Sequence, residues 1–315
     1  MVVLKNLSLL SALAAVAKAL TIPSDSAELD EGYEVSIASP VGWDPNILAQ
    51  EPFPKWLQDF TGLKDWPGLD PPYIPLDFLD LSKIPAFAPH EQGICPADRA
   101  SCSFDCHKCV EPDDVFTCDT LSQTFDDGPS PATPKLIEHL KHKTTFFTLG
   151  INVVRYPEIY RQTRDAGHLM ASHTYSHKFL PSLTTEQVIA QLEWSIWAQN
   201  ATGNHLPKWW RPPYGGIDNR IRAIARQFGL QAVLWDYDTF DWQILSNQKT
   251  EAEVVSDVRR WVASPNPRGL ILEHDGAIQT VNAGIAVNDI IGPKQKKASE
   301  CVGGIDYIRT FSSTH

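Results

Sequence analysis

The sequence predicts an α/β fold with a mainly parallel sheet or barrel, and two observations support this. Short apolar runs alternate with segments that carry helix start and stop signals. A polar or charged motif also follows each of five such runs. Because loops at the carboxyl ends of parallel strands form the active sites of such folds, we expect these motifs to lie on one face. With 43% apolar residues, the 315-residue chain can build a substantial core.

Six strands are expected, each a short apolar or β-branched run: residues 121–125, 144–149, 168–172, 208–211, 231–235 and 269–272. Four helices are expected between them, starting near Thr133, Pro157, Thr184 and Asp218 or Asn219. Thr133 would cap the first helix, with Pro134 at the first helical position. Thr184 and Gln187 have the form of a capping box, opening a helix to about Gln199. Gly167 and Gly229 would close the second and fourth helices.

Two adjacent carboxylates, Asp126 and Asp127, follow the first predicted strand, and Gly128-Pro129 then turns the chain. In a metal hydrolase, one such acid can hold a cation while its neighbour takes a proton from water. An acidic surface turn is the alternative interpretation of this pair.

Two histidines, His173 and His177, lie four positions apart, which would place both on one face of a helical turn. Two imidazoles and one carboxylate leave metal positions open for water, the pattern of a catalytic zinc site. The motif is not His-Glu-x-x-His, so it lacks the built-in glutamate base of zincin proteases. A solvated surface pair is the alternative.

Three further motifs also follow predicted strands. One holds Arg211 beside two prolines, another holds Asp241 and Trp242, and the last ends an apolar run on His274. Scattered surface acids and histidines would have no reason to gather at the same ends of successive strands. The sequence therefore predicts one site made from all five motifs.

In this order, the motifs resemble those of the polysaccharide deacetylases, known as carbohydrate esterase family 4 or NodB-homology enzymes. The matching segments are residues 124–130, 173–177, 211–215, 238–242 and 272–275. The resemblance covers about residues 118–310, with no departure at a motif position. It implies a distorted (β/α) barrel of the NodB type over residues 118–310.

A closer resemblance reaches upstream, to the sporulation-specific chitin deacetylases of yeasts, through residues 55–78, 101–106 and 301–308. It implies hydrolysis of the N-acetyl groups of chitin polymer or oligomers to chitosan and acetate, for the ascospore wall. The alternatives are deacetylation of xylan or peptidoglycan, or a wall-binding protein with a vestigial site. A vestigial site predicts a lost ligand or acid, and none is lost from this sequence.

The resemblance also implies a role for each motif residue. Asp127, His173 and His177 would hold the metal, expected to be Zn²⁺, with another divalent metal such as Co²⁺ as the alternative. Asp126 would act as general base, and Arg211 would hold it in place and keep it ionised, since a nearby cation lowers a carboxylate pKa.

The remaining motif residues would serve the acetyl and amine groups. The backbone N–H of Tyr214 would complete the oxyanion hole. His274 would protonate the leaving amine, oriented by Asp241. Trp242 and Leu272 would shape the pocket for the acetyl methyl group.

The N-terminal residues 1–19 combine Lys5, an apolar run and Ala17-Lys18-Ala19, which predicts a secretory signal cleaved after Ala19. The tail, residues 311–315, lacks the apolar stretch of a GPI anchor. We therefore expect a soluble monomer without a transmembrane anchor, secreted to the spore wall or extracellular matrix. A net charge of −11 without a basic stripe gives no reason to expect nucleic-acid binding. Asn200 begins a glycosylation sequon.

Six cysteines suit secretion, which favours disulfides over a zinc knot. Cys118 precedes the first strand and Cys301 lies near the end of the domain, so we infer that these two pair. The other four, Cys95, Cys102, Cys106 and Cys109, could pair in three ways. We expect the stapled segment, residues 95–117, to lack a core of its own.

An irregular extension is expected over residues 20–94, where prolines prevent long helices. Trp43, Trp56 and Trp66 could stack on sugar rings in this extension. We favour the interpretation that they anchor it against the barrel.

Overall fold

The computed structural model describes residues 47–97 and 99–312, which excludes the predicted signal segment and Trp43. A seven-stranded sheet with only parallel pairings forms its centre, which confirms the predicted α/β class. Its strands are β1 (Leu121–Asp126), β2 (Thr145–Thr148), β3 (Leu169–Ser172), β5 (Trp209–Trp210), β6 (Gln231–Ala232), β7 (Tyr237–Asp238) and β8 (Gly269–His274).

The strand order is β6-β5-β3-β2-β1-β8-β7. The two edge strands, β6 and β7, follow one another in the chain but are not hydrogen-bonded together. The barrel is therefore open between them. A separate antiparallel pair joins β4 (His205–Pro207) to β9 (Tyr307–Thr310), and β4 contacts α7.

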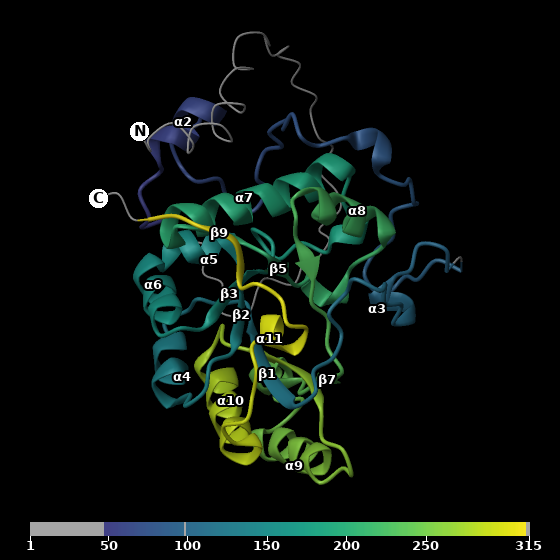
Figure 1. The fold of residues 1–315 in the computed structure, drawn as a ribbon, viewed down its shortest axis with the longest axis vertical. Helices are drawn as coiled ribbons and strands as arrows, with labels where there is room; N and C mark the ends of the chain where they lie inside the picture. Colours follow the sequence, from purple (N-terminus) through teal and green to yellow (C-terminus); the bar gives the residue numbers. More distant parts are fainter. Residues whose placement is uncertain (1–46, 98, 313–315) are drawn as a thin grey trace.

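Helices surround the sheet in Figure 1. They are α2 (Lys55–Thr61), α3 (Phe104–His107), α4 (Thr133–His139), α5 (Gly150–Arg155), α6 (Pro157–Asp165), α7 (Thr185–Gly203), α8 (Asn219–Gln227), α9 (Glu251–Val262), α10 (Ile278–Ile291) and α11 (Ala298–Cys301). Short 3₁₀ turns are η1 (Leu81–Lys83), η2 (Leu180–Ser182), η3 (Pro213–Gly215) and η4 (Asp241–Ser246). In the part of the chain that the structure describes, no helix combines the length and apolar character needed to cross a membrane.

All six predicted strands are present, with shorter or longer ends than predicted. The Thr184 capping box and the Asp218 cap are confirmed, because each side chain accepts a backbone N–H of the first helical turn. The predicted cap at Thr133 is wrong, since Ala132 occupies that position. The Thr133 hydroxyl instead accepts the N–H of Ser130 and donates to Asp275, in a loop of the site.

The extension is anchored on α7, as the sequence predicted for its described tryptophans. The Trp66 ring packs edge-on against Phe53 and Trp194, at centroid distances of 5.1 and 6.3 Å. Trp56, like Phe53 and Trp66, packs against a buried apolar cluster that contains Trp194. The Trp194 indole donates to the Pro72 carbonyl at 2.8 Å. These contacts fix residues 53–74 against the sheet's covering helix.

Three disulfides staple the fold. The predicted bond joins Cys118 to Cys301. The four remaining cysteines pair as Cys95–Cys106 and Cys102–Cys109. The stapled segment shares the core of the rest of the chain, because Phe104 belongs to the same buried cluster as Leu180, Trp210 and Ile217.

Candidate active site

Strands β1 and β8 bring the acidic pair and His274 together. They pair in parallel with Asp126 opposite His274, at the ends of both strands. Successive residues of a strand point to opposite faces, so two adjacent carboxylates would normally diverge. Here Asp127 adopts a left-handed conformation, with φ of 78°. The chain leaves the strand at this residue, and both carboxylates line the same hollow.

A buried carboxylate, Asp275, holds in place the loop that follows Asp127. It accepts the N–H of Gly128 at 3.0 Å and the hydroxyl of Thr133 at 2.6 Å. A Cβ atom on Gly128 would lie 2.2 Å from its Oδ2, so only glycine fits there. Burial raises the pKa of Asp275 to about 7. Asp275 was not predicted as a site residue, although its place directly after His274 in the fifth motif was a signal.

The two histidines converge, but not on a helical turn as the sequence analysis expected. Residues 173–177 form a loop, and Thr174 and His177 have φ of 68° and 63°, which a right-handed helix excludes. Nδ1 of His173 donates to the Arg211 carbonyl at 2.8 Å, and Nδ1 of His177 lies 3.0 Å from the Tyr214 hydroxyl. These contacts direct both Nε2 atoms toward Asp127.

Asp127, His173 and His177 form a buried group that fits a metal ion. Their ligand atoms lie within 4.8 Å of one another, and Asp127 Oδ1 is 3.5 Å from His173 Nε2 and 3.2 Å from His177 Nε2. Among the described residues, that buried oxygen has no hydrogen-bond donor. Burial lowers the pKa of both imidazoles, which favours the neutral form that binds metals. The set suits one divalent cation with positions left open.

Arg211 holds Asp126 beside this group. Its buried guanidinium donates to Asp126 Oδ1 at 2.8 Å and to the Thr124 hydroxyl at 2.7 Å. It also lies 4.1 Å from the centre of the Phe147 ring. Burial raises the pKa of Asp126 to about 7, and Arg211 opposes that rise. A carboxylate with this pKa suits proton transfer near neutral pH.

Opposite the acidic pair, His274 is held by Asp241. One Asp241 oxygen lies 2.7 Å from the imidazole Nδ1, and the other accepts the backbone N–H at 2.9 Å. Burial alone would lower the pKa of His274, but Asp241 and the acidic pair outweigh it and raise this pKa to about 10. The imidazole is therefore protonated at neutral pH.

These groups surround a hollow of about 400 Å³, within the usual range for small-ligand sites. Its lining residues are Gln92, Asp126, Asp127, His173, His177, Pro212, Tyr214, Trp235, Asp238, Trp242, Leu272 and His274. Leu272 is a buried wall with 6% of its surface exposed, whereas Trp242 forms an open rim at 41%. Gln92 and Trp235 were not predicted, because neither carries a charge or lies within one of the five motifs. Pro212 lies within the third motif, but nothing in the sequence assigned it a role.

Asn200 lies away from this hollow, half-buried in the last turn of α7. Its carbonyl accepts the N–H of Asn204, where the helix ends. Glycosylation at Asn200 stays a prediction.

Comparisons with known proteins agree with the motif pattern. A family model described as "Polysaccharide deacetylase" matches residues 113–233. Chitin deacetylase 2 of Saccharomyces cerevisiae is 61% identical over 265 residues, covering 83% of this chain and 84% of the relative. Chitin deacetylase 1 of the same yeast is 54% identical over 265 residues, covering 83% and 87%. The solved chitin deacetylase of Colletotrichum lindemuthianum has a TM-score of 0.56 at 26% identity, covering 64% of this chain and 97% of that one.

Proposed function

Since the chain belongs to the polysaccharide deacetylase family, we propose that it hydrolyses the N-acetyl groups of chitin to give chitosan and acetate. The buried Asp127-His173-His177 group carries this proposal, together with a base candidate on one side and a protonated histidine on the other. Two relatives that share more than half of their aligned residues with this chain are named chitin deacetylases.

The metal is proposed to be Zn²⁺, with another divalent metal such as Co²⁺ as the alternative, held by Asp127, His173 and His177. A bound metal would lower the pKa of a water molecule and polarise the acetyl carbonyl. Asp126 accepts a proton from the attacking water molecule, and Arg211 keeps the receiving carboxylate in one orientation. The water oxygen then bonds to the acetyl carbon.

His274 completes the reaction. As the C–N bond breaks, its imidazolium gives its proton to the departing amine, and acetate leaves with the added oxygen. Asp241 holds the imidazole in position through Nδ1, which leaves Nε2 to donate. The backbone N–H of Tyr214 donates to the oxyanion in this scheme. Leu272 and Trp242 enclose the acetyl methyl group, with Leu272 as its buried wall.

We assign catalysis to a domain over residues 118–310, preceded by the extension of residues 20–94 and the stapled segment of residues 95–117. The three disulfides support secretion, because such bonds persist in oxidising compartments. The proposed setting is the spore wall, where a monomer acts on chitin.

A substrate panel tests the proposal. Acetate release is measured from N-acetylglucosamine oligomers, acetylated xylan and peptidoglycan, with the metal identified by elemental analysis. We expect release from the chitin oligomers and about one metal ion per chain. Preference for xylan or peptidoglycan, or the absence of acetate from every chitin oligomer, would overturn the assignment.

A further inference from the structure

The extension reaches the active-site hollow at a single residue, Gln92. Every other lining residue lies at position 126 or later, within the proposed catalytic domain. Gln92 is exposed, and its side chain forms no hydrogen bond with another residue of the described ranges 47–97 and 99–312. A polar amide therefore borders the site without a structural partner there.

A tight turn presents Gln92 to the hollow. The N–H of Ile94 donates to the Glu91 carbonyl at 3.0 Å, which closes a four-residue turn. Gly93 occupies the third position with φ of 80°, the conformation that a type II turn requires there. Gln92 is consequently the corner residue of the turn.

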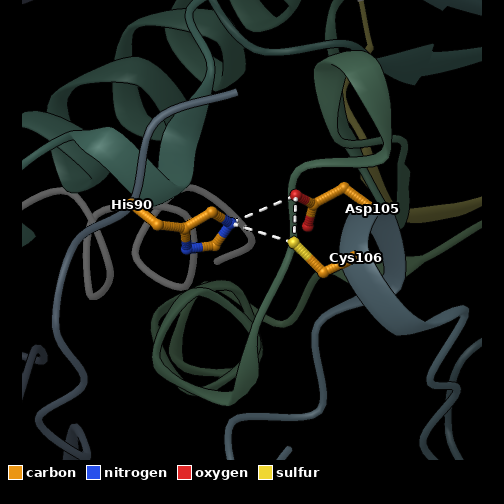
Figure 2. A group of neighbouring side chains, drawn as sticks. All are labelled: His90, Asp105 and Cys106. Carbon is orange, nitrogen blue, oxygen red and sulfur yellow. Dashed lines mark hydrogen bonds and ion pairs between the residues drawn. The ribbon is translucent and has the colours of Figure 1, made fainter. Parts of the chain in front are cut away.

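The residue before this turn, His90, is held in place by contacts with other segments. Figure 2 shows its ring directed from the extension toward Asp105 and Cys106, which come from α3. His90 Nε2 lies 3.1 Å from Asp105 Oδ2, and the two side chains are only 7% and 11% exposed. The ring also packs edge-on against Phe179 at 5.6 Å, and the His90 N–H donates to the Pro181 carbonyl at 3.3 Å.

The His90 cluster has metal-like spacing, since its ligand atoms lie within 4.8 Å of one another. A thiolate is the form of cysteine that binds metals, and Cys106 is bonded to Cys95 instead. The disulfide and the His90–Asp105 pair together hold both ends of the segment 90–95 on α3. The cluster is therefore a clasp rather than a metal site.

We propose that Gln92 contacts the substrate, its carboxamide hydrogen-bonding a hydroxyl or acetamido group of a chitin sugar, and that the His90–Asp105 clasp positions it. This inference rests on the proposed function. The carboxamide offers two donors and an acceptor, which suits both sugar groups. Because the clasp orders the turn before the sugar binds, less conformational entropy is lost on binding.

Gln92→Ala tests the contact. Loss of one hydrogen bond should raise KM for an N-acetylglucosamine pentamer by about 5- to 10-fold, with a smaller change in kcat. Calorimetry with the same pentamer should show a matching loss of affinity. Glu91→Ala is the matched control, since Glu91 lies in the same turn outside the lining and should keep the parent KM. A parental KM in Gln92→Ala, or a fall in kcat alone, would overturn the contact.

The clasp is tested by a double-mutant cycle. His90→Ala should raise KM like Gln92→Ala, and the combined variant should be no worse than Gln92→Ala alone, because both act through one contact. His90→Gln can still donate to Asp105 and should restore the parent KM. Additive losses, or a fall in melting temperature without a change in KM, would overturn the clasp. If the parent itself releases no acetate from chitin oligomers, the proposed function fails, and calorimetry still decides whether Gln92 binds the sugar.

Discussion

Both oxygens of the Asp241 carboxylate bond to His274, one to its imidazole Nδ1 at 2.7 Å and one to its backbone N–H at 2.9 Å. This double contact fixes the ring and the chain that carries it. With Nδ1 occupied, the ring can transfer a proton only through Nε2. The surrounding carboxylates raise the pKa of His274 to about 10, so Nε2 carries a proton at neutral pH, which suits a proton donor to a leaving amine rather than a metal ligand.

Replacing His274 with asparagine separates these two roles. Loss of a general acid should lower kcat by about 10²–10⁴-fold, with KM close to that of the parent. The metal content should be unchanged, because Asp127, His173 and His177 form the metal group without it. Metal stoichiometry, melting temperature and kcat are measured on one preparation. A variant that loses its metal or unfolds would assign His274 to metal binding or to the core.

The pH profile should report the Asp241 contact. Burial lowers the pKa of His274, but the carboxylates around it raise this pKa to about 10 in the folded protein. The His274 imidazole is then fully protonated at neutral pH and loses its proton as pH rises through about 10. Asp241→Asn removes the first of those charges, so the alkaline limb of kcat should move to lower pH. An unchanged alkaline limb would show that another group controls it.

The same shift predicts a stability contribution with a defined direction. Because the folded pKa of His274 exceeds its unfolded value of 6.5, the stabilisation is fully present below pH 6.5. It is lost between there and about pH 10. The free energy of unfolding in urea is measured for the parent and for Asp241→Asn between pH 6 and pH 9. The difference between the two free energies should narrow as pH rises, given about 1.4 kcal/mol per pKa unit. A difference that widens would contradict the assigned protonation.

Metal retention should depend on His173 but not on a histidine outside the site. His173→Ala removes one of two imidazole ligands and should abolish both metal retention and acetate release while the domain stays folded. His139→Ala is the matched control, since His139 pairs with Asp289 on the partly exposed surface of α4. Elemental analysis and melting temperature are compared for the two. Full activity of His173→Ala in metal-free buffer would refute the metal group.

The sequence predicted the fold class and the meeting of its motifs because both follow from alternating periodicity and from strand ends. It missed β4, β7 and β9, since strands of two to four residues show too little of a period unless, like β5 and β6, they lie within a longer predicted run. It also placed the histidine pair on a helical turn. The positive φ angles of Thr174 and His177 are set by the hydrogen bonds of the folded loop, which spacing alone does not encode. Gln92 was missed because its role depends on where a turn of the extension meets the domain.

The disulfide between Cys118 and Cys301 should contribute strongly to stability. Its cysteines are 183 residues apart in the sequence, and closing a loop of that size is worth about 5 kcal/mol in the chain-entropy model. Non-reducing peptide mapping should recover the two cysteines in one linked pair. The double variant Cys118→Ala/Cys301→Ala should unfold at lower denaturant with the other two disulfides intact. A free thiol at either position would contradict the pairing.

Gly128 tests how tightly the acidic loop is held. A Cβ atom there would lie 2.2 Å from Oδ2 and 2.5 Å from Oδ1 of Asp275, so Gly128→Ala must displace the carboxylate or the loop. Overpacking of this kind costs about 1–3 kcal/mol. Because Asp127 directly precedes Gly128, the displacement should also weaken metal retention. Gly68→Ala is the matched control, since nothing lies within 4 Å of its added carbon and its φ is not positive. Melting temperature and metal stoichiometry are measured for both. If Gly128→Ala keeps its metal and has the same melting temperature as Gly68→Ala, then Asp275 does not hold the loop in place.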